Sequence, residues 1–228
     1  MVFKLNPYNP CVANKQIEGK QCTILWYVDD VKISHVNQQT VTDILKELED
    51  VFETLTIKRG KEHTYVGMHF KIRDDKRVEI SMQEYIKECV AAFKEPISAK
   101  ANTPAKHTLF ELDTGELSEQ LKKEKSEVFH LIVSKLLYVS KRTRLDIDIT
   151  ISHLCTRTTK STKGYWEKPH RLLTYLNNTI GMKSIIGLNG TGDLRTWADV
   201  SYGVHEDMKG HTRGTMPLGH GLVYQKKS

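Results

Sequence analysis

The chain has 228 residues, of which 39% are hydrophobic and 27% charged. Its net charge is +6 and its pI about 9.0. No apolar stretch approaches the roughly 20 residues of a membrane helix, and the first residues lack the apolar core and cleavage site of a signal peptide. We therefore expect no membrane and no secretion. The positive charge favours a polyanionic partner, with nucleic acid ahead of an acidic membrane surface.

The cysteines indicate neither a disulfide framework nor a zinc finger. Cys11, Cys22, Cys89 and Cys155 are scattered, and no Cys-x-x-Cys pair accompanies them. Zinc fingers need closely spaced ligands. His153 lies two residues from Cys155, but two ligands make no site, so we expect a structural thiol there.

Residues 22–35, CTILWYVDDVKISH, predict a β-hairpin. An apolar run precedes the two aspartates and an alternating strand follows them, so both strands are expected to be largely buried. Aspartate is a common turn former, and the pair Asp74 and Asp75 is interpreted as such a turn. Asp29 and Asp30 differ because a rigid turn forces two carboxylates together unless a cation compensates. A divalent ion such as Mg²⁺ accepts carboxylates together with phosphate oxygens.

Helices and a second hairpin are predicted up to about residue 95. Apolar residues at helical spacing within 41–52 predict a helix capped at Thr40. Segments 64–72 and 77–82 predict the hairpin, and Ser81 is expected to cap the next helix. These elements mix strands and helices in a sheet-plus-helix layer.

The character of the chain changes in the polar segment 94–108, which contains two prolines and is expected to hold a domain boundary. Mostly helical sequence follows as far as Gly181. Strand character then returns, and segments 194–203 and 221–225 are predicted to pair. The sequence thus predicts an α+β fold in three parts, residues 1–95, 96–182 and 183–228.

Basic residues cluster in the predicted helices. Lys141, Arg142 and Arg144 form one cluster, and Lys168 and Arg171 belong to another. Each cluster is either a solvated helix face or a surface that contacts nucleic-acid phosphates. Charge alone leaves both readings open.

The tetrapeptide Tyr27-Val28-Asp29-Asp30 resembles the Tyr-x-Asp-Asp motif of reverse transcriptases. Other segments resemble copia-type retrotransposon polymerases, in the same order along the chain. They are TYVGMHFKI, VEISMQEYIKECVAAF, ANTP, FHLIVSKLLYVSKRTRLDI, KPHRLLTYLNNTIG and WADVSYGVHEDMKGHTRG. The resemblance covers nearly the whole chain.

The resemblance implies an RNA-directed DNA polymerase that transfers phosphoryl groups with two metal ions. Asp29 and Asp30 would hold Mg²⁺ or Mn²⁺ once the site is completed, and Tyr27 would lie beside the primer end and the incoming nucleotide. The partners would be an RNA template, a DNA primer, deoxynucleoside triphosphates and the remaining parts of a polyprotein. The location would be the cytoplasm, in a virus-like particle, or the nucleus.

The resemblance also implies an arrangement of domains. Residues 1–95 would be part of a polymerase palm, 96–182 a helical thumb and connection, and 183–228 the beginning of a ribonuclease H-like domain with a truncated β-hairpin. Asp199 would be the first metal-binding carboxylate of that last domain.

Contacts with the nucleic acid follow from the same resemblance. The strands around Val66, Gly67 and Met68 would grip the primer, and Gly67 would let the backbone approach closely; the alternative for Gly67 is an ordinary β-bulge. Basic side chains of the thumb and connection would follow the duplex backbone. These residues are Lys141, Arg142, Arg144, Lys168 and Arg171.

The chain departs from the family in its carboxylates. The family's polymerase site takes a further aspartate from an earlier palm strand, but only Glu18 precedes Asp29 as a carboxylate. Ribonuclease H needs further carboxylates, and Glu206 or Asp207 is expected in a loop instead of the helical ligand position. Leu145 replaces the family's proline, which loosens a helix break. We therefore expect a fragment of a copia-like polyprotein that is inactive alone.

Other classes of function stay open. One is a non-catalytic nucleic-acid-binding remnant or domesticated module, in which the basic helices still bind duplex. Another is a structural or interaction protein, or a remnant that does not fold and exposes a sheet edge. A nucleotidyltransferase outside the retroelements is disfavoured, because it would not reproduce the helical motifs.

Overall fold

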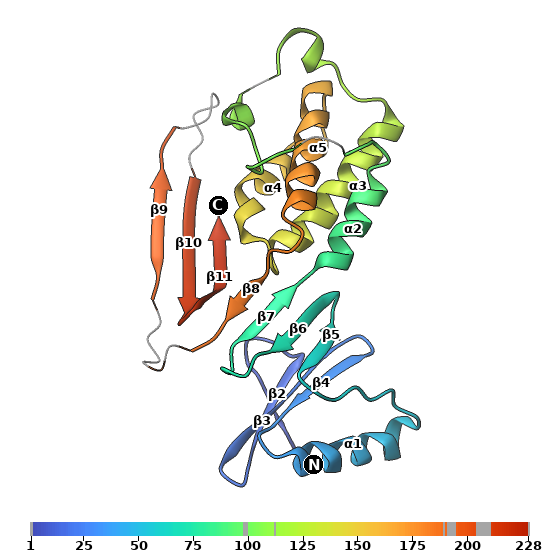
Figure 1. The fold of residues 1–228 in the computed structure, drawn as a ribbon, viewed down its shortest axis with the longest axis vertical. Helices are drawn as coiled ribbons and strands as arrows, with labels where there is room; N and C mark the ends of the chain where they lie inside the picture. Colours follow the sequence, from blue (N-terminus) through green and yellow to red (C-terminus); the bar gives the residue numbers. More distant parts are fainter. Residues whose placement is uncertain are drawn as a thin grey trace. The chain divides into compact units, whose positions relative to one another are not determined.

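The structure is a computed structural model that describes residues 2–97, 100–111, 113–188, 190, 195–203 and 211–227. The chain divides into two compact units, residues 1–67 and 68–228. Figure 1 follows the chain by colour through both units. Each unit contains helix and strand, so the α+β class predicted from the sequence is confirmed.

The first unit contains an antiparallel sheet whose strands follow one another along the chain, in the order β1-β2-β3-β4. One helix and a short strand come after the sheet. The elements are β1 (Lys4–Leu5), β2 (Val12–Ile17), β3 (Lys20–Tyr27), β4 (Asp30–Ser34), α1 (Gln38–Phe52) and β5 (Glu62–Tyr65).

The two faces of this sheet differ in polarity. Ile24 lies opposite both Ala13 and Ile33, and Trp26 lies opposite Val31. Side chains that are directly opposite in an antiparallel pair point to the same face, so this face is apolar, and Ala13 is buried in it. An antiparallel sheet commonly has one such face and one polar face.

The second unit contains four helices and two sheets, in the strand orders β6-β7-β8 and β11-β10-β9. Its elements are β6 (Met68–Ile72), β7 (Val78–Ser81), α2 (Gln83–Ala92), α3 (Lys123–Ser140), α4 (Asp148–Cys155), α5 (Lys163–Asn178), β8 (Ser184–Ile186), β9 (Trp197–Ser201), β10 (His211–Leu218) and β11 (Gly221–Lys227). Short 3₁₀ helices cover His107–Phe110, Gly115–Ser118 and Leu145–Ile147.

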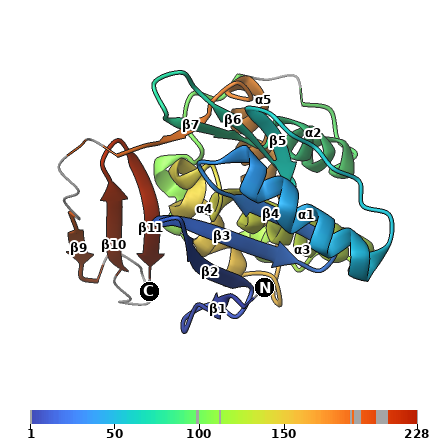
Figure 2. The same ribbon diagram turned by 90° about the horizontal axis from the view of Figure 1, so that it is seen from below.

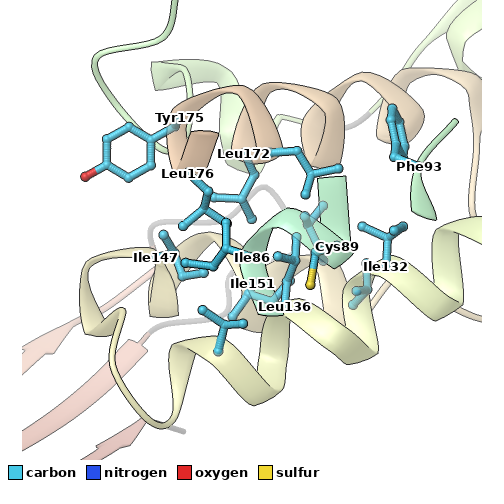
Figure 3. Packing of buried hydrophobic residues seen from close by; sticks show 14 of the residues in the cluster. Ile86, Cys89, Phe93, Ile132, Leu136, Ile147, Ile151, Leu172, Tyr175 and Leu176 are labelled. Carbon is cyan, nitrogen blue, oxygen red and sulfur yellow. The ribbon is translucent and has the colours of Figure 1, made fainter. Parts of the chain in front are cut away.

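One apolar cluster unites the four helices of the second unit (Figure 3). Its fully buried members include Ile86 and Cys89 of α2, Leu136 of α3, Ile151 of α4 and Leu172 of α5. Burying a leucine or isoleucine side chain contributes roughly 1.5–3 kcal/mol. Helix α2 therefore shares a core with α3 and α5, and the expected boundary in the segment 94–108 does not separate two cores.

The second expected boundary, between residues 182 and 183, also falls inside the second unit. Strand β8 follows α5 and pairs with β7, where Ser184 lies opposite Ile80 and Ile186 opposite Val78. It thus completes the sheet of the second hairpin. The pairing joins residues about a hundred positions apart, which local sequence patterns do not reveal.

The C-terminal sheet differs from its prediction. Strand β10 lies between β9 and β11 and pairs with both (Figure 2), so the expected direct pairing of 194–203 with 221–225 is wrong. The sequence hides β10, because Gly214 and Pro217 interrupt its strand pattern. The register shifts between Met216 and Pro217, as at a β-bulge.

Both expected helix caps are also wrong. Asn37, instead of Thr40, caps α1, because its side chain accepts a hydrogen bond from the backbone N–H of Gln39 at 2.9 Å. Asparagine is among the strongest N-cap residues. Ser81 ends strand β7, and Met82 occupies the cap position of α2 without a side-chain hydrogen bond.

Candidate functional site

The two aspartates lie at a tight turn, as the sequence predicted. Strand β3 ends at Tyr27, the turn consists of Val28 and Asp29, and Asp30 begins β4. Tyr27 and Asp30 are opposite each other in the ladder, so their side chains belong to one face of the sheet. The four residues form what we call the acidic tip.

Val28 adopts an unfavourable backbone conformation, with φ +55°. The left-handed region costs an L-residue roughly 1–2 kcal/mol, and β-branched residues seldom enter it. A two-residue hairpin turn demands such a φ and usually recruits glycine or asparagine. Strain of this kind is found preferentially at functional sites, which makes the acidic tip a stronger candidate than its sequence alone.

Both carboxylates of the acidic tip are exposed, as are Tyr27 at 57% and Val28 at 86%. Within the described residues, neither Asp29 nor Asp30 forms a hydrogen bond or an ion pair. The expectation that the flanking strands are largely buried is wrong, because β3 and β4 are mostly half-buried or exposed and Val31 is 52% exposed. The turn is thus held by the ladder and not by a surrounding core.

The face that carries Tyr27 and Asp30 includes a lysine two residues along β4. Lys32 is half-buried, and burial lowers its pKa. Tyr65, at the end of β5, has a raised pKa, caused first by burial and then by the negative charge of Asp30 and the neighbouring Cys11. Tyr65 is therefore within electrostatic range of the acidic tip, and its hydroxyl keeps its proton at neutral pH.

The acidic tip suits a hard divalent cation in its chemistry. Mg²⁺ binds one or two carboxylates and completes its octahedron with waters and phosphate oxygens. Asp29 and Asp30 are adjacent, exposed and not engaged by a competing cation among the described residues. Across the described ranges, no group of three or more histidine, cysteine, aspartate or glutamate residues is close enough to hold a metal. The tip therefore offers two ligands.

The expected primer-gripping residues occupy a second tight turn. Val66 and Gly67 both have positive φ, +50° and +69°, and Met68 begins β6. A two-residue turn with two positive φ values requires glycine or a similar residue at these positions. Gly67 is thus explained by the turn, and neither the close approach to a primer nor the β-bulge is needed to account for it.

Arg144 does not fit its predicted role. Its side chain is 1% exposed. The guanidinium donates two hydrogen bonds to the Asp146 carboxylate, at 2.8 and 3.0 Å, and two more to the Thr179 hydroxyl and carbonyl. The prediction that Arg144 contacts nucleic acid is therefore wrong, because a guanidinium that is buried and hydrogen-bonded in this way cannot reach a phosphate.

The other predicted basic residues divide into engaged and available cations. Lys141 donates to the fully buried Asp148 at 2.6 Å. Lys168, 16% exposed, lies 3.9 Å from Asp113, and burial lowers its pKa. Arg171 donates to the hydroxyl of Thr103. The remaining predicted residue is Arg142, which is exposed and forms no ion pair within the described residues.

Asp199, the expected ribonuclease H ligand, lies exposed in β9 opposite Arg213 of β10. The structure therefore pairs it in register with a cation and with no second carboxylate. Glu206 and Asp207, considered as further ligands, lie outside the described residues.

A polar network that was not predicted from the sequence connects α4 with the C-terminal sheet. The carboxylate of Asp148, at the start of α4, accepts hydrogen bonds from Lys141 and from Gln225 of β11, each at 2.6 Å. Gln225 in turn accepts from Arg213 at 3.0 Å. A buried acid needs such partners, but nothing in the sequence identifies Gln225 as one of them.

A cavity of about 780 Å³ follows one side of α5 and was also not predicted. Its lining includes Lys168, Arg171 and Trp166 of α5, with Asp113 and Glu95 from the preceding segment. The indole of Trp166 donates to Glu95 at 2.9 Å. The lining carries both acidic and basic side chains, and two pairs of them are in contact, Lys125 with Glu95 at 3.5 Å and Lys168 with Asp113 at 3.9 Å.

Comparisons with models of known protein families, with curated proteins and with solved structures find no match to this chain. None of the described helices combines the length and the apolar character that crossing a bilayer requires. The features of this chain that bear on its function are therefore the geometry of the acidic tip and the distribution of charge.

Proposed function

We propose that this chain carries the catalytic Tyr-x-Asp-Asp tip of a copia-like reverse transcriptase, an RNA-directed DNA polymerase. The observation that supports the proposal most is the acidic tip. It combines two exposed carboxylates, which have no ion-pair partner in the part of the chain that the structure describes, with a tyrosine opposite Asp30 and a strained turn at Val28.

In this proposal each residue of the acidic tip has a separate task. Asp29 and Asp30 bind the divalent cation, with Asp29 as the stronger ligand, and Tyr27 positions the primer end against the incoming nucleotide. Bound Mg²⁺ supplies charge neutralisation for phosphoryl transfer. The substrates are an RNA template, a DNA primer and deoxynucleoside triphosphates. The family's further carboxylate would come from a palm strand that joins the tip.

Two measurements test the proposal. The first is Mn²⁺ binding to the purified chain, followed by electron paramagnetic resonance; we expect one ion, lost in Asp29→Asn and in Asp30→Asn. Asp50→Asn, which removes an exposed carboxylate from α1 of the same unit, is the matched control. Binding that is equal in all variants would contradict the proposal.

The second measurement is primer extension on an RNA template with Mg²⁺ or Mn²⁺. We expect no synthesis by the chain alone and Asp29-dependent synthesis when a polypeptide with the family's earlier palm strand is added. Robust synthesis by the chain alone would show that the acidic tip finds its third carboxylate within this chain. Absence of synthesis in both arms, together with absent Mn²⁺ binding, would remove the polymerase assignment.

A second candidate is a nucleic-acid-binding module without catalysis, supported by the net charge of +6. It keeps the basic surface and assigns no task to Asp29. Filter binding over a salt series distinguishes it, since phosphate contacts make affinity fall steeply with salt. Binding that persists unchanged in Asp29→Asn, with no Mn²⁺ bound, would favour this candidate.

A further inference from the structure

We infer that a strip of two tyrosines and two cations binds the phosphate backbone of single-stranded nucleic acid. The strip, which we call the tyrosine strip, consists of Tyr85 of α2, Lys135 and Tyr138 of α3, and Arg142 in the turn after α3. Lys135 lies 5.0 Å from the ring centroid of Tyr85, and Arg142 lies 4.0 Å from that of Tyr138. The two rings are 5.4 Å apart and tilted by 46°. The two rings therefore lie next to each other, and each of them holds one cation.

The rings hold the two cations without cancelling their charge. Two other cations of this unit are paired with carboxylates, Lys141 with Asp148 and Arg144 with Asp146. Within the described residues, Lys135 and Arg142 have no carboxylate partner. A cation–π contact fixes the side chain by attraction to the ring quadrupole, so the full positive charge stays available. An anion can then bind without first displacing an acidic side chain.

The spacing of the strip suits a nucleic-acid strand. The two rings that hold the cations are 5.4 Å apart. Phosphates in one strand advance by about 3.4 Å per nucleotide along a duplex axis, so the two rings lie about one to two nucleotides apart. A stretched single strand spans the same distance with fewer phosphates.

Tyrosine hydroxyls add hydrogen-bond donors to the strip. The pKa of Tyr85 is raised, first by burial and then by neighbouring groups that include Cys89, Tyr138 and Glu88. Tyr85 therefore keeps its proton at neutral pH, and tyrosine hydroxyls commonly donate to phosphates. Surfaces that combine basic side chains with aromatic rings are typical of single-strand binding. The charge of Glu88 opposes an anion here.

This inference goes beyond the proposed function, because it needs neither the acidic tip nor a metal ion. It also assigns the nucleic-acid contact to a different set of residues from the one predicted from the sequence. Of that set only Arg142 belongs to the tyrosine strip. The strip binds any single strand through its phosphates, so base sequence has little effect.

The test is fluorescence anisotropy of a labelled oligothymidylate, titrated with the full chain over a salt series. Lys135→Gln and Arg142→Gln should each weaken binding several-fold at low salt. Each should also reduce the slope of log affinity against log salt by about 0.7, the value for one phosphate of a single strand. Tyr138→Leu removes the ring that holds Arg142 and should weaken binding by no more than Arg142→Gln does.

Two controls separate binding from folding. Lys163→Gln removes a cation that is paired with Glu119, and the salt slope should not change. Glu88→Gln removes the opposing charge and should strengthen binding about twofold to threefold, by analogy with a surface charge pair. A purely structural role of the strip predicts no such gain.

Each outcome decides the inference. Lowered melting temperatures in Lys135→Gln and Arg142→Gln with unchanged binding would make the strip structural and overturn it. Tighter binding of a matched duplex than of the single strand, with the same dependence on the strip, would also overturn it. Asp29→Asn should bind the oligonucleotide normally, so failure of the polymerase proposal leaves this result unaffected and can be told apart from it.

Discussion

The two compact units differ in how they are held together. Among the described residues 2–67, the buried apolar side chains are Ala13, Cys22 and Ile44. In the second unit, the apolar cluster of α2, α3, α4 and α5 is continuous. A unit with few buried apolar contacts depends on its backbone ladder and opens locally at low free energy. The candidate chemistry thus belongs to the less buried unit, and the predicted basic residues belong to the well-packed one.

The largest expected effect comes from a substitution that creates a cavity in the core of the second unit. Leu136 is fully buried in α3, and Leu136→Ala should lower the free energy of unfolding by about 2–5 kcal/mol. The matched control is Leu131→Ala, because Leu131 is on the same helix but 48% exposed. This variant should change the free energy of unfolding by less than about 0.5 kcal/mol. Urea denaturation with hydrogen exchange measures both. Equal effects at the two positions would contradict the packing described for this unit.

The next largest expected difference in stability is between variants of two neighbouring cations, Lys141 and Arg142. Lys141→Ala leaves the buried Asp148 carboxylate with Gln225 as its remaining hydrogen-bond donor, and should cost about 2–3 kcal/mol because a buried charge loses a partner. Arg142→Ala removes an exposed cation and should cost less than about 1 kcal/mol. Lys141→Ala combined with Asp148→Asn should recover part of the loss, since the uncompensated charge is gone. Denaturation of the three variants measures this coupling.

The pH dependence of stability tests the ion pair between Asp146 and the buried Arg144. Burial alone raises the pKa of Asp146, but hydrogen bonds from Arg144 and Tyr175 more than offset it and hold the pKa below its ordinary 3.8. A carboxyl whose pKa is lowered on folding stabilises the fold above the unfolded pKa and loses this contribution as the pH falls below it. Stability should therefore fall below about pH 4.

Two variants isolate this contribution from that of other acids. In Tyr175→Phe the carboxyl loses one hydrogen bond, so its pKa rises and the acid-induced loss becomes smaller. Asp146→Asn should remove the contribution altogether and lower stability at neutral pH, because Arg144 is then buried without a counter-charge. Urea midpoints between pH 2 and 7 measure the slope. Wild-type and Asp146→Asn curves that run parallel would contradict the assignment.

The sequence allowed local features to be predicted better than pairings between distant segments. The hairpin with its turn at Asp29, the mostly helical sequence before Gly181 and the α+β class follow from periodicity and turn chemistry. The β7–β8 pairing does not, because its partners are about a hundred residues apart. Arg144 was misassigned for a similar reason. A buried arginine and an exposed one have the same sequence signature, and the difference lies in Thr179 and Asp146.

The candidate site shows the same limit. Position 28 is an ordinary apolar residue in the sequence, and only the backbone reveals its positive φ. The partner of Asp30 in the ladder was predictable from the hairpin, whereas the influence of its charge on Tyr65 was not. Strain and electrostatic range depend on three-dimensional placement, so sequence patterns identify a site's residues more readily than its physical state.

The smallest expected effect concerns the strained turn itself. Val28→Gly relieves a backbone conformation that costs an L-residue roughly 1–2 kcal/mol, but glycine loses more entropy on folding, by about 0.5–1 kcal/mol. The variant should therefore stabilise the first unit by at most about 1.5 kcal/mol. If the strain serves to fix Asp29, the same variant should bind Mn²⁺ several-fold more weakly, because the carboxylate becomes less preorganised.

Val66 provides the matched control, since it has a similar positive φ of +50° in a turn without carboxylates. Val66→Gly should give a similar gain in stability and leave Mn²⁺ binding unchanged. Hydrogen exchange at the two turns and Mn²⁺ titration measure both effects. If Val28→Gly stabilises the unit and binds Mn²⁺ as tightly as the wild type, the strain is a by-product of the turn. The acidic tip would then lose its strongest structural distinction from an ordinary aspartate turn.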